Sequence, residues 1–312
     1  MKRCAATLLI LLITCTTVSS QGWNKVDFPS TEKLTGAFFV HPDTGYVIAS
    51  GGKCYRTFDA GKLWEGFDVT YDRALEDLYF FNADTGFVCG QAGALYVTYD
   101  AGYTWENKSF DDSTVWFFDM EMFSRSHGMA IGLKSDGDNR FGGFAVRTTD
   151  GGKTWKSQKS LGIGYSRILS GADSTVYLVS FSRLHVSNDF GRKWESRTTH
   201  DGNPARTLAV HDKTMVLAGM GGTIYYSHDK GLTWFPSQQD IDKLFLTAVM
   251  VNDSVGYIGG INTTILRTAD GGRTWNEELL AVSTFAVHDL FLIGHRLYAV
   301  GSDGNVIYKE VR

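Results

Sequence analysis

Six aspartates of this 312-residue chain occur in the same local sequence, Ser/Thr-x-Asp-x-Gly-x-x-Trp. Repeated carboxylates could bind a metal ion or act as general acids and bases. However, no histidine, cysteine or second carboxylate recurs beside them, as a shared ligand set would require. We therefore predict no metal and no cofactor, and assign a structural role to Asp59, Asp100, Asp150, Asp189, Asp229 and Asp270 and to the tryptophans that follow, Trp64, Trp105, Trp155, Trp194, Trp234 and Trp275.

The spacing of this sequence suits a turn between two antiparallel strands. The aspartate can accept hydrogen bonds from nearby backbone N–H groups, and the Ser/Thr hydroxyl can add a second local bond. The glycine permits a positive φ. The tryptophan begins the next strand and buries a large ring. We predict a hairpin at each copy.

Arginines form a second group of candidates for chemistry. Arg167 and Arg206 each follow a tryptophan by twelve residues, so we expect equivalent positions on adjacent repeats. Two arginines converging on one site could hold a carboxylate or an acidic peptide tail. The alternative is a pair of surface arginines without a ligand.

Hydrolysis of a glycoside would need two carboxylates roughly 5–10 Å apart across a cleft. Candidates are Glu76, Asp77, Asp112 and Asp242, but no spacing singles out a pair. No Arg-x-Pro sequence of the kind expected of a sialidase is present. Trp116 and Tyr165 could stack on sugars in a carbohydrate-binding module. These readings remain alternatives.

The elements that position these residues follow from the spacing of the tryptophans. From Trp23 to Trp275 the intervals are 41, 41, 50, 39, 40 and 41 residues, and the last unit is incomplete. Each unit is rich in β-formers and lacks a 3.6-residue apolar period. We predict an all-β fold, a seven-bladed propeller of four-stranded antiparallel blades.

The two ends of the chain complement each other. The seventh unit stops after its third strand, and residues 22–28 resemble the missing tryptophan-led strand. We predict that this N-terminal strand completes the last blade and closes the ring. The longer third unit is explained by a loop at about 133–142, for which a calcium site is a weaker alternative to a solvated loop.

The first twenty residues resemble a secretory signal, with Lys2 and Arg3 before an apolar run and cleavage after Ser20. Lipidation at Cys15 and a membrane anchor are alternatives. Residues 21–312 would then form the propeller. Cys54 and Cys89 remain, either as a disulfide or as two buried thiols.

Removal of the signal takes away two basic residues and no acidic one, which leaves 28 basic and 34 acidic residues and a net charge of −6. An acidic chain of this kind argues against nucleic acid as a partner.

The six copies match the Asp-box (BNR) repeat of sialidases, other glycoside hydrolases and sortilin-type domains. More closely, the units resemble those of the photosystem II stability/assembly factor family. Residues 80–87, Phe-Phe-Asn-Ala-Asp-Thr-Gly-Phe, and residues 268–275, Thr-Ala-Asp-Gly-Gly-Arg-Thr-Trp, carry this resemblance best. It spans the mature chain and implies a seven-bladed, non-catalytic propeller that acts in assembly. No motif aligns with the family's basic interaction patch.

We therefore expect an exported, monomeric, non-catalytic propeller with a protein partner, and a glycan is the alternative ligand. In such propellers the connections between blades and the Asp-box hairpins lie on opposite faces, and the former face usually binds. The candidate residues there are Arg73, Trp116, Tyr165, Arg167, Arg206 and Lys243.

Overall fold

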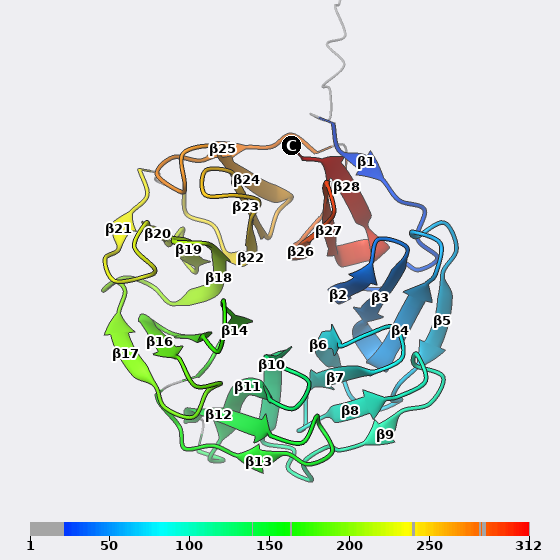
Figure 1. The fold of residues 1–312 in the computed structure, drawn as a ribbon. Helices are drawn as coiled ribbons and strands as arrows, with labels where there is room; N and C mark the ends of the chain where they lie inside the picture. The colour runs from blue at the N-terminus through cyan, green and yellow to red at the C-terminus, as the bar shows by residue number, and fades with distance from the viewer. Residues whose placement is uncertain are drawn as a thin grey trace, which may run out of the picture.

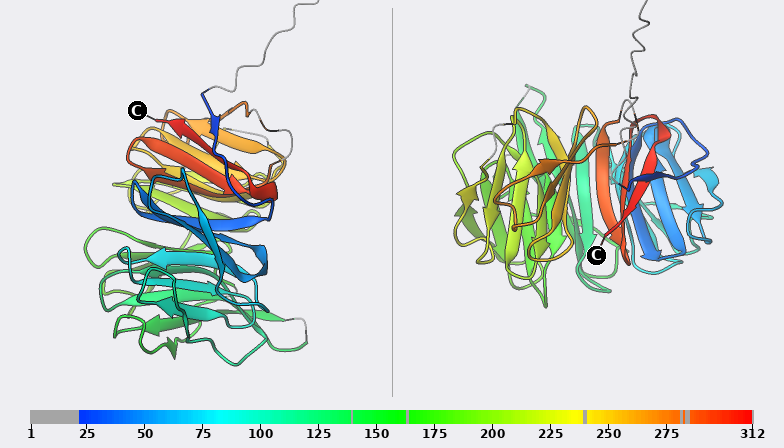
Figure 2. Two further views of the ribbon diagram at one scale, coloured as in Figure 1. Left: turned by 90° about the vertical axis from the view of Figure 1, so that its right-hand side faces the viewer. Right: turned by 90° about the horizontal axis from the view of Figure 1, so that it is seen from above.

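Seven four-stranded antiparallel sheets surround a central axis in the computed structural model, which describes residues 22–138, 140–162, 164–238, 241–280, 282 and 285–311. Figure 1 looks along the axis, and Figure 2 shows the same ring from its side and from above. Among the described residues, no helix has the length and apolar character needed to cross a membrane. The predicted seven-bladed propeller is confirmed.

The strands follow one another blade by blade. Blades 1–3 contain β2 (Leu34–His41), β3 (Thr44–Ala49), β4 (Lys53–Thr57), β5 (Glu65–Asp68), β6 (Leu75–Phe80), β7 (Gly86–Gly90), β8 (Leu95–Thr98), β9 (Glu106–Asn107), β10 (Val115–Met122), β11 (Gly128–Ser135), β12 (Phe141–Thr148) and β13 (Lys156–Ser157).

Blades 4–7 contain β14 (Arg167–Ser170), β15 (Val176–Ser180), β16 (Arg183–Ser187), β17 (Glu195–Thr198), β18 (Ala205–His211), β19 (Thr214–Gly219), β20 (Ile224–Ser227), β21 (Phe235–Pro236), β22 (Phe245–Met250), β23 (Gly256–Gly260), β24 (Thr264–Thr268), β25 (Asn276–Glu277), β26 (Val287–Ile293), β27 (Arg296–Gly301), β28 (Val306–Glu310) and β1 (Asn24–Lys25). Two short 3-10 helices are η1 (Ser50–Gly52) and η2 (Ser302–Gly304).

Each blade begins with its innermost strand and ends with its outermost strand (Figure 1). The alternating apolar side chains of the inner strands pack between neighbouring blades. The cluster that contains Leu75, Leu78 and Phe80 of blade 2 also contains Tyr46 and Ile48 of blade 1. The core is therefore a series of blade junctions around the axis.

The N-terminal strand completes blade 7, as predicted. β1 pairs with β28 through Asn24↔Tyr308 and Lys25↔Ile307, and the two strands lie side by side in Figure 1. The Trp23 side chain is 5% exposed, and its Nε1 donates to the buried Glu278 carboxylate at 3.1 Å. Lys309 Nζ lies 2.5 Å from the same carboxylate. A buried ion pair and an indole thus join both ends of the chain to blade 6.

The Asp-box hairpins connect the third and fourth strands and have the predicted bonds. In blade 2, Thr98 Oγ1 donates to Asp100 Oδ1 at 2.8 Å and accepts from the Gly102 N–H at 2.8 Å. The Thr104 N–H donates to Asp100 Oδ1 at 2.8 Å. Gly102 has a φ of 84°, which other residues adopt with difficulty. Each aspartate therefore closes its own turn.

We expect Asp270→Ala to lower the free energy of unfolding by about 1–2 kcal/mol, because Thr274 N–H loses its acceptor. That N–H donates to Asp270 Oδ1 at 2.9 Å, and the Thr274 hydroxyl donates to Oδ2 at 2.6 Å. Urea denaturation measures the change. Asp270→Asn keeps an acceptor oxygen and should cost less, and the exposed Asp111→Ala is the matched control. Equal stability of Asp270→Ala and Asp111→Ala would refute the structural role.

Two local expectations need correction or completion. The long third unit does not contain a loop from 133 to 142, because β11 and β12 continue pairing through Leu133↔Gly143 and Ser135↔Phe141. β11 ends at Ser135 and β12 begins at Phe141, and Arg140 between them forms ion pairs with Asp136 and Asp138. Cys54 and Cys89 are buried free thiols in two different core clusters.

Candidate functional site: a polar pocket on the propeller axis

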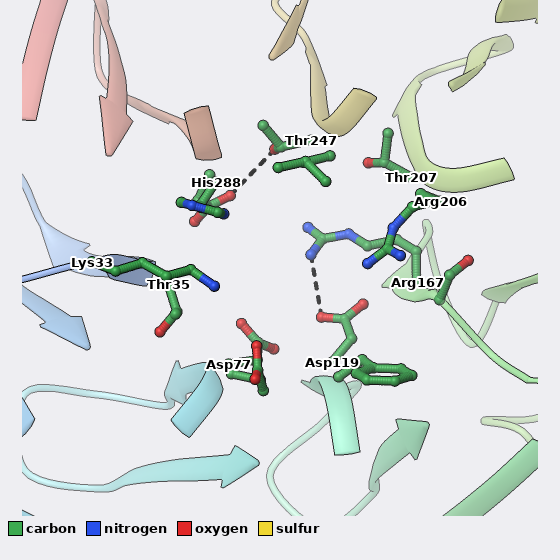
Figure 3. Close-up of a pocket in the computed structure, with 14 residues that line it drawn as sticks. Lys33, Thr35, Asp77, Asp119, Arg167, Arg206, Thr207, Thr247 and His288 are labelled. Carbon is green, nitrogen blue, oxygen red and sulfur yellow. Dashed lines mark hydrogen bonds and ion pairs between the residues drawn. The ribbon is translucent and has the colours of Figure 1, made fainter. Parts of the chain in front are cut away.

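A polar pocket of about 220 Å³ lies on the axis, where the inner strands begin (Figure 3). The strand register places this end opposite the Asp-box hairpins. Leu34, at the start of β2, pairs with Ala49, whereas the Asp box of the same blade follows Thr57, which pairs with Gly45. The pocket therefore opens on the face formed by the connections between blades, the face expected to bind.

The pocket is built from the same two positions of successive blades. Near the start of the inner strands, one extra residue interrupts the pairing register in six blades. In blade 4, Ser166 N–H and Arg167 both face Val179, which produces the same bulge. A bulge redirects a side chain locally. We call the bulged residues the outer ring: Thr35, Glu76, Phe118, Ser166, Arg206, Leu246 and His288.

The residue after each bulge forms a deeper layer, the inner ring, whose side chains lining the pocket are Asp77, Asp119, Arg167, Thr207, Thr247 and Asp289. Blade 1 contributes Gly36 at this position. The inner ring is strongly polar although it lies within otherwise apolar strands. Its oxygen atoms must therefore find partners, since unpaired buried polar groups are costly.

The inner-ring oxygens bind the inner edge of the next blade. Asp77 Oδ2 accepts from Met120 N–H at 2.8 Å, and Asp119 Oδ2 accepts from Ile168 N–H at 2.6 Å. At two further junctions Asp289 accepts from the backbone of β2 at 3.2 Å and Thr247 from that of β26 at 3.1 Å. The bonds satisfy N–H groups that the innermost strand cannot pair within its own sheet. These side chains therefore hold neighbouring blades together.

Arg167 crosses the pocket floor and lies beside Asp119, with Nη1 3.2 Å from Oδ1 (Figure 3). Burial opposes its charge, but the carboxylates of Asp119 and Asp77 outweigh burial and raise the pKa of Arg167. Its Nε has no hydrogen-bond partner among the described residues. Asp119 thus holds the guanidinium through Nη1, while the Nε donor remains without a partner among the described residues.

Burial also shifts the pKa of several other groups that line the pocket. Burial, and then the adjacent Asp119 carboxylate, raise the pKa of Asp77 well above its ordinary value. Burial also raises the pKa of Asp289 and of Glu76. Burial and the nearby Lys33 ammonium lower the pKa of His288 to about 4. At neutral pH the imidazole is uncharged, so the cations of the pocket are lysine and arginine.

Glu121, two residues beyond Asp119 on β10, supplies a pH-dependent test of burial near the axis. Burial raises the pKa of Glu121 to about 7, although the Ser170 hydroxyl donates to it at 2.6 Å. Its ordinary pKa in an unfolded chain is about 4.3, so the folded state binds the proton more tightly between these values. The stability that it contributes is present below about pH 4 and is lost as the pH rises through 7.

We therefore expect the melting temperature of Glu121→Gln, relative to that of the wild type, to increase between pH 4.5 and 7.5 and to level off above. Scanning calorimetry across this range measures the difference. Glu106→Gln, which breaks an exposed ion pair with Lys108, is the matched control and should show no comparable rise. Parallel curves for Glu121→Gln and the wild type would contradict this assignment.

The two predicted arginines both line the pocket, but their positions are not equivalent. Arg206 belongs to the outer ring and Arg167 to the inner ring, where Thr207 is the counterpart of Arg167. The expectation was wrong by one residue. Trp155 precedes the bulged residue of the next blade, Ser166, by eleven residues, whereas Trp194 precedes the corresponding Arg206 by twelve. The shorter connection places Ser166 where Arg206 stands in the next blade.

The other candidates of this face are dispersed. Tyr165 is 2% exposed because it fills the buried position before the bulge, so it is not the exposed stacking platform that was considered. Trp116 is 37% exposed and contacts Phe118, with ring centroids 5.2 Å apart. Arg73 donates to Ala92 O at 3.2 Å, and Lys243 pairs with a glutamate of β25 at 2.9 Å.

The proposed glycosidase carboxylates do not form a cleft pair. Glu76 and Asp77 are adjacent in the pocket, and Asp77 is bonded to the next blade. Asp112 is bound to Lys134 at 2.6 Å, and Asp242 is exposed outside the pocket lining. Asp77 therefore joins neighbouring blades, and Asp112 belongs to a surface ion pair.

Sequence reasoning missed Lys33, Asp119, His288 and Asp289. A usable signal was present in the inner strands, where a charged residue interrupts an apolar run, as in Phe117-Phe118-Asp119-Met120. Alignment of the units on that interruption, instead of on the preceding tryptophan, would have identified both rings.

Comparison with known proteins supports this architecture. The family model described as Photosynthesis system II assembly factor YCF48 matches residues 15–113 and 62–157. Photosystem II assembly lipoprotein Ycf48 of Nostoc sp. is 27% identical and that of Trichormus variabilis 24% identical, each over 87% of this chain and 82% of the relative. A solved structure titled "YCF48 bound to D1 peptide" has a TM-score of 0.73 at 17% identity, covering 95% of this chain and all of that one.

At 17% identity the structural match shows the fold alone, whereas the family model and the curated relatives agree with the repeat sequences in pointing to one family. The chain is therefore a seven-bladed Asp-box propeller that resembles the photosystem II assembly factor family.

Proposed function

We propose that the protein is an exported, non-catalytic propeller that binds a partner protein during assembly of an envelope complex, through the face around the axial pocket. The observation that carries this proposal is that the acidic side chains of the pocket have internal partners and two of its cations do not. Its inner-ring carboxylates are bonded to backbone N–H groups, while the side-chain cations of Lys33 and Arg206 have no hydrogen bond or ion pair with any described residue.

A binding role suits this arrangement better than glycoside hydrolysis does. A hydrolase needs a free carboxylic acid and a free carboxylate on opposite sides of the bond. Here Asp77 and Asp119 are tied to adjacent blades and have little freedom to approach a substrate. The names of the relatives agree, since they are called assembly lipoproteins and one related structure contains a D1 peptide.

Export would follow from the first twenty residues, which lie outside the described part of the structure. Relatives named as lipoproteins support lipid attachment, for which Cys15 is the candidate, beside the alternative of cleavage after Ser20. Labelling with a palmitate analogue separates the two. Lipidation predicts a label that Cys15→Ser abolishes, whereas cleavage after Ser20 predicts an unlabelled protein that begins at Gln21.

The partner is tested by crosslinking in the native host, followed by purification of wild type and of Lys33→Glu/Arg206→Glu. The matched control, Lys153→Glu/Arg192→Glu, makes the same charge change at exposed positions of the Asp-box face. We leave Arg167 unchanged because its loss would disturb Asp119. A partner that is lost only from the first variant supports the proposal. Loss from both variants, or no specific partner for the wild type, contradicts it.

A further inference from the structure

The axial pocket has the size for the end of a peptide and not for a folded segment. Its volume is about 220 Å³. Pockets for drug-sized ligands are usually about 300–1,000 Å³. The ring of inner strands encloses it on every side, so a ligand must enter from the open face. One residue at a chain terminus, or one long side chain, satisfies both limits.

Three cations point toward the middle of this pocket in Figure 3. Lys33 reaches in from blade 1 and Arg206 from blade 5, on opposite sides of the axis, while Arg167 lies on the floor between them. The side-chain cations of Lys33 and Arg206 make no hydrogen bond or ion pair with the described residues, and Arg167 has an unpaired Nε. Charged donors without an internal acceptor favour an external anion.

The acidic groups of the pocket leave this positive site largely intact. Asp77, Asp119 and Asp289 accept hydrogen bonds from backbone N–H groups of neighbouring blades. Glu76 is the one outer-ring acid, and its carboxylate interacts electrostatically with Lys33 and Arg206. Glu76 therefore acts as an internal anion, and an incoming carboxylate would compete with it for Lys33 and Arg206.

Apolar surface adjoins the pocket on one side. Phe118 belongs to the outer ring, and the partly exposed Trp116 ring packs against it. A ligand whose anion reached Lys33 and Arg206 would extend over these two rings as it left the pocket. Aromatic surface of this kind favours an apolar residue beside the anionic group.

We propose that the axial pocket binds a peptide carboxylate between Lys33 and Arg206, with an apolar neighbouring residue on Trp116 and Phe118. This inference rests on the proposed function and specifies its ligand. The carboxylate could be the C-terminus of the partner chain or the side chain of an acidic residue, and both present the same chemistry to the pocket.

Fluorescence anisotropy with three labelled pools of random hexapeptides tests the proposal. One pool has a free C-terminus and no acidic residue, the second is amidated but contains one acidic residue, and the third is amidated without acids. The proposal expects binding of at least one of the first two pools, and which of them binds identifies the source of the carboxylate. Binding that is equal for all three pools, or absent for all three, overturns it.

Variants then locate the site, because some are expected to weaken peptide binding and one is expected to strengthen it. We expect Lys33→Gln/Arg206→Gln to weaken binding at least tenfold and Trp116→Ala to weaken it several-fold. Glu76→Gln should tighten binding, because the competing anion is removed. Lys243→Gln, on the same face but paired with Glu277, is the control and should bind as the wild type does. Weaker binding by Glu76→Gln, or wild-type binding by the double variant, would place the ligand elsewhere.

Failure of this inference can be distinguished from failure of the proposed function. If the wild type crosslinks to a specific partner in the host but binds no acidic peptide, the function stands and the pocket assignment falls. If peptides bind in the pattern above and no partner is found in the host, the pocket assignment stands without the assembly role. Melting temperatures near that of the wild type verify that the variants are folded.

Discussion

Deletion of residues 22–28 is expected to destabilise the whole propeller, with a loss of at least about 4 kcal/mol in the free energy of unfolding, since truncation of one buried Trp alone costs about 3–5 kcal/mol. The deletion removes Trp23 and strand β1, and it leaves the edge of β28 unpaired. It also leaves the buried Glu278 without the Trp23 donor. Calorimetry of wild-type and truncated protein measures the effect.

The matched control for this deletion is Trp116→Ala, which removes an indole that is 37% exposed and lies far from the closure of the ring. We expect it to change the melting temperature by only a few degrees. A truncated protein that melts with the wild type would show that β1 is dispensable. A loss of comparable size in Trp116→Ala would show that any tryptophan has the same effect.

The second large effect is expected at the junction between blades 3 and 4. Asp119→Ala should destabilise the protein by about 3–5 kcal/mol, the usual cost of removing one partner of a buried ion pair. The Asp119 side chain is 5% exposed and serves both Arg167 Nη1 and Ile168 N–H. Its removal leaves the partly exposed Arg167 guanidinium without its ion-pair partner and a buried N–H without an acceptor. Urea denaturation at pH 7 measures the change.

Two variants separate the contributions at this junction. Asp119→Asn keeps an acceptor for Ile168 N–H and loses only the charge, so we expect an intermediate effect. Asp112→Ala breaks the more exposed pair with Lys134 and should cost less than about 1 kcal/mol. If Asp119→Ala and Asp112→Ala were equally stable, the inner ring would have no role in joining the blades.

The sequence predicts the blades well because the Asp box is a local structure. Thr98, Asp100 and Gly102 lie within five residues and complete one another's hydrogen bonds without help from distant segments. The period of the tryptophans then counts the blades, and the incomplete last unit indicates the closure. None of these steps requires knowledge of a long-range contact.

The pocket was harder to predict because its two rings depend on a one-residue bulge and on connection length. Arg167 and Arg206 share their distance from a tryptophan, yet the shorter connection before Tyr165 moves one of them into the deeper ring. Lys33 could not be recognised, since it adjoins the pocket from outside both rings. A side-chain role that depends on contact with a neighbouring blade is hard to recognise from the sequence of a single repeat.

The division between the two rings has a consequence for how such proteins can diversify. A change at an inner-ring aspartate removes a bond between blades, so folding itself constrains that layer. The outer ring carries fewer such bonds. Among its described side chains, only Thr35 and Ser166 donate to the backbone of the next blade, to Leu75 O at 2.9 Å and to Ala205 O at 3.2 Å. Each outer-ring side chain comes from a separate blade. Single substitutions at the other five outer-ring positions could alter ligand preference one blade at a time while the scaffold persists. The residues free to set ligand specificity and the residues that hold the blades together thus lie in adjacent layers, one residue apart along the inner strands.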